Sequence, residues 1–184
     1  KPYVRKLKKG KRKKANPMNK ALHISYEWAE TLFPEGISYP SSIVISGRGG
    51  SGKPLVELAF VAEWIRQGGK AIGIPLQYPD ASFLKKSIYK LYDLDLNRYP
   101  EQNRYVRFDP EIAGTEKINR EEYRANLLMP EVWDSVVDQA RQELSTPRED
   151  LLVYGSALNL LLFAPKYQSA IVDKIRQMLL NTQD

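Results

Sequence analysis

Apolar residues recur at two different spacings along the chain, and these spacings separate predicted helices from predicted strands. A helical spacing of three or four positions predicts helices at residues 25–33, 53–67, 82–92, 131–144 and 167–180. Short runs rich in apolar and β-branched residues predict strands at residues 42–46, 71–74, 105–108 and 151–154. Strands and helices therefore alternate from residue 42 onward. This order predicts an α/β fold with three layers, in which a mainly parallel sheet carries helices on both faces.

A glycine-rich segment joins the first predicted strand to the helix at 53–67. Its sequence, Gly47-Arg48-Gly49-Gly50-Ser51-Gly52-Lys53, fits the phosphate-loop pattern G-x-x-x-x-G-K in the strand-to-helix context that this pattern requires. Glycines allow backbone N–H groups to turn inward around an anion, the helix adds the positive end of its dipole, and the lysine adds a charge. We therefore expect a nucleotide to be bound by Gly47, Arg48, Gly49, Gly50, Ser51, Gly52, Lys53 and Pro54. The alternative that the residues leave open is a glycine-rich turn that binds no ligand.

The residue after the lysine departs from this pattern. A phosphate loop has Ser or Thr there, and its hydroxyl holds the magnesium ion. Here the residue is Pro54, which fits the first turn of a helix but has no hydroxyl, and Leu55 cannot replace it. We expect ATP or ADP as the cofactor, magnesium bound weakly if at all, and no residue that serves as a metal ligand.

With this motif placed, the chain from about Lys20 to Leu162 resembles the RecA-type P-loop ATPases, and their KaiC-like branch in particular. In that branch a short helix and a turn precede the first strand, as residues 25–36 do here. The segment Gly68 to Ile74 resembles the family's next strand, and Tyr78-Pro79-Asp80 resembles the start of the helix that follows it. The segment Lys90 to Leu96 resembles the family's leucine-glycine-aspartate segment. The resemblance implies a RecA-type P-loop sheet with the Gly47–Lys53 loop as Walker A.

The chain lacks the acids that the family uses for hydrolysis. The family's two catalytic glutamates would fall near Leu76 and Gln77, and neither residue can act as a general base. Residues 151–158 resemble the Walker B strand, but Tyr154 or Gly155 stands where the aspartate should be. The resemblance therefore implies a degenerate member, a pseudo-ATPase without catalytic residues. It would bind nucleotide with weak or no hydrolysis and act as a regulatory or partner-binding module.

An active ATPase is the alternative if another acid or a neighbouring subunit completes the site. Glu57 lies one turn into the helix at 53–67 and could reach the loop. The simpler interpretation of Glu57 is an exposed acid on a helix surface. On either interpretation the activity is at most that of an ATPase.

The net charge of +6 is concentrated at the N-terminus. Residues 1–20 hold ten lysines or arginines and no acid, so the rest of the chain, with 18 basic and 22 acidic residues, carries −4. We expect residues 1–19 to form a flexible basic tail and residues 20–184 to form the P-loop domain. The tail predicts nucleic-acid binding through Arg5, Lys6, Lys8, Lys9, Lys11, Arg12, Lys13 and Lys14. A solvated basic leader without a ligand is equally consistent with this composition.

Composition excludes several other classes of protein. The chain has no cysteine, which excludes a disulfide framework and a thiolate nucleophile, and His23 is its only histidine. The longest apolar runs, such as residues 158–164, are far below the roughly 20 residues of a membrane span. The basic stretch is followed by no apolar signal-peptide core. We expect a cytoplasmic protein with no membrane association.

The sequence stops one predicted helix after the Walker B-like strand, so we expect a domain truncated at the C-terminus or a small sheet. Either would leave a sheet edge open, and an open edge is a natural place for a strand from another chain to pair. We therefore expect a homo-oligomer or a protein partner.

Overall fold

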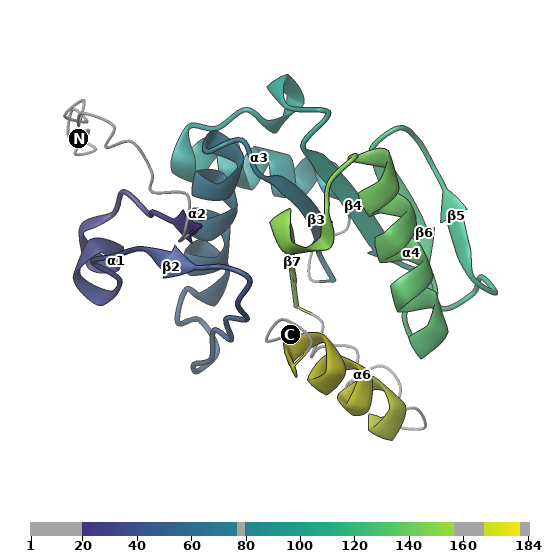
Figure 1. Cartoon of the computed structure of the whole chain (residues 1–184). Coiled ribbons are helices and arrows are strands. Elements are labelled where there is room, and N and C mark those ends of the chain that lie inside the picture. The colour runs from purple at the N-terminus through teal and green to yellow at the C-terminus, as the bar shows by residue number, and fades with distance from the viewer. Residues whose placement is uncertain (1–19, 77–79, 157–167, 181–184) are drawn as a thin grey trace.

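The computed structural model describes residues 20–76, 80–156 and 168–180 (Figure 1). Its centre is a five-stranded sheet in the order β5-β6-β4-β3-β7. The strands are β3 (Lys70–Ile74), β4 (Asn103–Phe108), β5 (Thr115–Lys117), β6 (Glu122–Ala125) and β7 (Leu151–Gly155). The pairs β3–β4, β3–β7 and β4–β6 are parallel, and β5 pairs antiparallel with β6. The fold is therefore α/β with a mixed, mostly parallel sheet, as expected.

Helices cover both faces of this sheet. The helices are α1 (Glu27–Leu32), α2 (Lys53–Arg66), α3 (Ala81–Tyr92), α4 (Pro130–Glu143) and α6 (Gln168–Leu180), with the 3-10 turns η1 (Leu96–Arg98) and η2 (Arg148–Asp150). Side chains of β3 alternate between the faces: Ala71 joins the core beneath α2 and α3, whereas Ile72 and Ile74 join the core beneath α4. This alternation produces the three expected layers (Figure 1). In the part of the chain that the structure describes, no helix has the length and apolarity to cross a membrane.

A small ribbon lies beside the main sheet and precedes the glycine-rich loop. It consists of β1 (Ala21–Leu22) and β2 (Ile37–Ser38), which pair antiparallel on either side of α1. Leu22 is buried and Ile37 is partly buried, and both pack against the core beneath α2. The ribbon therefore anchors the N-terminal part of the described chain to the α2 face.

The predicted strand at residues 42–46 is absent, so that prediction was wrong. Residues 41–47 have no regular secondary structure, and Ile43 and Val44 are 44% and 61% exposed. β-branched side chains favour an extended backbone, but a strand also needs a neighbour that accepts and donates its backbone hydrogen bonds. This segment has no such neighbour in the described sheet. Only Ile45 is partly buried, against the core beneath α2.

Candidate functional site

The glycine-rich loop closes on its own lysine. The ammonium of Lys53 donates hydrogen bonds to the carbonyl oxygens of Gly47 at 2.8 Å and Arg48 at 2.9 Å. The N–H of Ser51 donates to the carbonyl of Arg48 at 3.2 Å, which makes the middle of the loop a tight turn. Lys53, which the sequence predicts to bind phosphate, therefore lies at the centre of a curled loop.

Two glycines give this loop its shape. Gly50 has a φ of +73° and Gly52 a φ of +79°, in the left-handed region that glycine tolerates best. Gly52 caps α2, and its carbonyl accepts the N–H groups of Leu55 and Val56. Pro54 has no N–H. An anion at this position would therefore depend on the loop amides and the lysine more than on the first turn of α2.

Glu57 connects the start of α2 to the sheet. Its carboxyl group lies near the backbone of Gly155, the last residue of β7, and this neighbour lowers the pKa of Glu57 in part. Because β7 runs parallel to its neighbour β3, Gly155 lies at the edge where the parallel strands end. The loop therefore lies at the carboxyl edge of the sheet, where α/β folds bind their ligands. The strand expected to lead into the loop is missing, so only the loop-to-helix half of the predicted context is present.

Glu57 is partly buried, so the prediction of an exposed surface acid was wrong. Burial raises the pKa of Glu57 from 4.5 to about 7, and the nearby backbone of Gly155 lowers it in part. Its spacing from Lys53 is the signal that could have found it. Residues four apart lie on the same face of a helix, so both side chains point from α2 toward the loop and the sheet.

The end of β7 carries no acid for a steric reason. A Cβ on Gly155, whose φ is +149°, would lie 2.2 Å from the carbonyl oxygen of Ile74 on the neighbouring strand. Tyr154 is buried against the α2 face. Of the two positions where the family's glutamates would fall, Leu76 is partly buried against the core beneath α4, and Gln77 lies outside the described residues. The described carboxyl edge therefore has no acid at these family positions.

The residues predicted to bind nucleic acid belong to the basic N-terminal segment. The basic positions from Arg5 to Lys14 lie outside the described residues. Among the residues that are described, no group of three or more His, Cys, Asp or Glu side chains is arranged to hold a metal ion.

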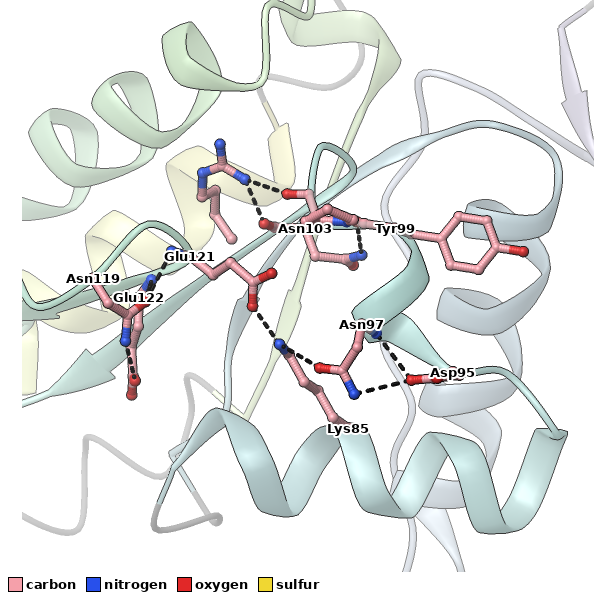
Figure 2. Close-up of polar contacts among 10 residues, drawn as sticks. Lys85, Asp95, Asn97, Tyr99, Asn103, Asn119, Glu121 and Glu122 are labelled. Atoms are coloured by element: carbon pink, nitrogen blue, oxygen red, sulfur yellow. Dashed lines mark hydrogen bonds and ion pairs between the residues drawn. The ribbon is translucent and has the colours of Figure 1, made fainter.

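A second polar region, which sequence reasoning did not find, lies along α3 and η1 (Figure 2). It contains a groove of about 570 Å³ whose lining includes Lys85, Lys86, Tyr89, Asp95, Arg98 and Tyr99. Lys85 pairs with Glu121 and donates to the side-chain oxygen of Asn97 at 3.1 Å, and Arg98 lies 3.8 Å from Asp95. Two of the groove's cations thus have acidic partners within the chain. This pairing favours a structural role, tying α3 to the start of β6.

Comparison of the chain with protein-family models, curated proteins and solved structures gave no match. The kinship with RecA/KaiC-like ATPases therefore stays a prediction from the residues.

Proposed function

We propose that this protein is a RecA/KaiC-like P-loop module that binds ATP or ADP at Gly47 to Pro54, with weak or no hydrolysis, and has a regulatory or partner-binding role. The supporting observation is the curled Gly47–Lys53 loop at the carboxyl edge of parallel strands. Its glycines with positive φ provide the backbone shape in which successive amides can converge on an anion.

The lysine supports phosphate binding because its present partners are weak ones. Carbonyl oxygens are neutral, whereas a phosphate oxygen is charged and makes hydrogen bonds roughly twice as strong. A nucleotide phosphate would therefore compete successfully with the carbonyls of Gly47 and Arg48 for the ammonium of Lys53. The exchange would release those carbonyls to solvent at the loop surface, where both residues are exposed.

Weak hydrolysis is supported by the acids that are missing. A general base must come within hydrogen-bonding reach of the attacking water. The position after β3 carries Leu76, and the end of β7 accepts no side chain. These two features favour binding over turnover.

Calorimetry with ATP, ADP and a non-hydrolysable ATP analogue tests the proposal, with the Lys53→Ala variant as the probe of the loop. Lys86→Ala is a matched control because Lys86 is an exposed lysine on α3. We expect binding by the wild type and by Lys86→Ala, and a loss of about tenfold or more in Lys53→Ala, since the lost bond is charge-assisted. Absence of binding at millimolar nucleotide would overturn the proposal.

An active ATPase is a second candidate, favoured by the position of Glu57 beside the end of β7. On this hypothesis phosphate release rises with protein concentration if a neighbouring subunit contributes, and it disappears in Lys53→Ala. A rate indistinguishable from the background of the buffer would exclude this candidate.

Nucleic-acid binding through the basic tail is a third candidate, favoured by the ten basic and no acidic residues at positions 1–20. Removing residues 1–16 should then abolish binding to a short duplex, while Lys53→Ala should leave it intact. The affinity should fall steeply with salt because phosphate contacts release counterions. Binding that ignores salt would count against this candidate.

The partner-binding part of the proposal is supported by a contrast between the two edge strands of the sheet, as far as the described residues form it. The β5 edge is three residues long and reads Thr-Glu-Lys, whereas the β7 edge is five residues long and reads Leu-Leu-Val-Tyr-Gly. Charged, short edges resist pairing with other chains, and apolar ones invite it. We propose that β7 pairs in a homo-oligomer. Hydrogen exchange of residues 151–155 should slow as protein concentration rises, and unchanged exchange would contradict the pairing.

A further inference from the structure

Two segments of the described chain have room for a strand neighbour. β7 is an edge strand whose partner in the described sheet is β3, and it lies at the opposite edge from β5 (Figure 1). Residues 42–46, Ser-Ile-Val-Ile-Ser, have strand composition but belong to neither sheet of the described chain. Both segments span five residues, and neither contains a charged residue or a proline. The two are therefore matched in length and in chemical character.

We propose that residues 42–46 of a second copy of this chain form the strand that pairs with β7, and that two copies exchange these segments reciprocally. This inference rests on the proposed homo-oligomer and names the strand that joins it. Charges and prolines are the usual devices that keep exposed strands from pairing, and both segments lack them. A reciprocal exchange gives each segment of each copy a neighbour and closes the assembly at two chains.

The present contacts of residues 42–46 leave the segment available for this exchange. From residue 40 to residue 51 every residue is exposed except Ile45, which packs against the core beneath α2. Ile43 and Val44 therefore present apolar side chains to water, and pairing would withdraw them from it. Of the apolar contacts, the exchange has to give up only that of Ile45.

A second copy is favoured over the same chain because a single chain leaves both segments unpaired. Ile45 packs against the core beneath α2, and β7 contributes Tyr154 to the same core, yet no strand pairing joins the two segments in the described chain. The exchange would also give the glycine-rich loop the preceding strand that the single chain lacks, because the segment ends at Ser46 and the loop begins at Gly47.

Cysteine crosslinking of the full chain tests the proposal, and the absence of natural cysteines makes each introduced thiol unique. Val44 and Val153 are the central residues of the two segments, so they come opposite each other in either strand direction. We expect a short thiol crosslinker to join Val44→Cys to Val153→Cys when the two single variants are mixed. The control mixture pairs Val44→Cys with Ile118→Cys, an exposed position next to β5, and should give no such dimer.

The double variant Val44→Cys/Val153→Cys distinguishes pairing between chains from pairing within one chain. On the proposal it forms covalent dimers. Crosslinks confined to single chains, with no covalent dimer in the mixture of single variants, would overturn the exchange in favour of pairing within the chain.

A charge in the segment gives a second measurement, in case a cysteine in β7 disturbs the fold. Val44→Lys should weaken dimerisation about tenfold or more in sedimentation equilibrium, because a lysine between apolar strands has no partner for its charge. It should also remove the slowing of hydrogen exchange at residues 151–155 with rising protein concentration. The control is Leu32→Lys on α1, where a comparably exposed apolar side chain is replaced and dimerisation should be unchanged.

The two proposals fail in different ways. Slowing of exchange that persists in Val44→Lys would overturn the assignment of residues 42–46 and leave the homo-oligomer through β7 standing. Absence of slowing in the wild type would overturn both the homo-oligomer and the exchange, while calorimetry with nucleotide would still decide the function of the loop.

Discussion

Tyr154 on β7 fills the space that a side chain on Gly73 of β3 would need. The two residues are register partners, and a Cβ on Gly73 would lie 2.7 Å from both the Cζ atom and the phenol oxygen of Tyr154. One residue further on, a Cβ on Gly155 would lie 2.2 Å from the carbonyl oxygen of Ile74. The contact between β3 and β7 beneath α2 therefore requires glycines at both positions.

The first prediction is that Gly73→Ala destabilises the protein by about 1–3 kcal/mol, the usual cost of overpacking a core. Tyr154 is buried, so its ring cannot swing into solvent to make room. The control is Gly114→Ala, where a Cβ would meet no atom within 4 Å. Urea unfolding measures both variants, and equal free energies of unfolding would contradict the packing described for β3 and β7.

The second prediction concerns the pH dependence of stability in buffer without divalent cations. Burial raises the pKa of Glu57 from 4.5 to about 7 in the folded chain. Between these two values the folded state binds more protons than the unfolded state, so this group lowers the free energy of unfolding as the pH rises. The full effect, at most about 3 kcal/mol, is reached above pH 7 and is absent below pH 4.5.

Glu57→Gln isolates that effect because glutamine does not titrate. The free energy of unfolding of Glu57→Gln, minus that of the wild type, should rise between pH 4.5 and pH 7. Urea unfolding at each pH measures it. Other groups cancel in this difference, including Glu143, whose pKa is lowered by the ammonium of Lys117. A difference that does not change with pH would show that the carboxylate is solvated in the folded state.

The sequence was a good guide to the helices and to three of the strands. Apolar spacing predicted a helix at 53–67, which the structure places at Lys53–Arg66, and a helix at 131–144, which it places at Pro130–Glu143. Helix α4 has one buried face, so its periodicity is clear, whereas eight consecutive residues of α2, Leu58–Ile65, are buried. The strands β3, β4 and β7 were also found, because each contains a short run rich in apolar and β-branched residues.

The sequence failed where pairing, not composition, decides the structure. Residues 42–46 have strand composition without a partner, whereas β5 (Thr115–Lys117) is polar and becomes a strand because β6 lies beside it. Local propensity carries no information about such partners. The same limit applies at the site: the motif identified the loop, but Glu57 and Gly155 are about a hundred residues apart in sequence, and only the fold brings them near each other.

The third prediction is that Pro54→Thr increases the effect of magnesium on ATP affinity. Threonine would add the hydroxyl that proline lacks, the group that holds magnesium in the phosphate-loop pattern. Calorimetry in EDTA and in magnesium compares Pro54→Thr with Pro54→Val, which has the same shape without the hydroxyl. If both variants respond equally to magnesium, the first turn of α2 does not face the cation.

The fourth prediction contrasts a buried ion pair with an exposed one. Arg104 on β4 is almost fully buried, donates to the carbonyls of Pro100 and Asn103 at 2.8 Å, and lies 3.4 Å from Glu143 of α4. Arg104→Met removes these donors, and each carbonyl left without a partner in the interior costs about 1–3 kcal/mol.

The matched variant is Arg98→Met, which removes an arginine that is 81% exposed and 3.8 Å from Asp95. Exposed pairs are worth less than about 1 kcal/mol, because water already solvates both charges. Urea unfolding should therefore separate the two variants clearly, with Arg104→Met the less stable. Similar free energies of unfolding would mean that water reaches Arg104. The contact of Arg104 on β4 with Glu143 on α4 would then contribute little to stability.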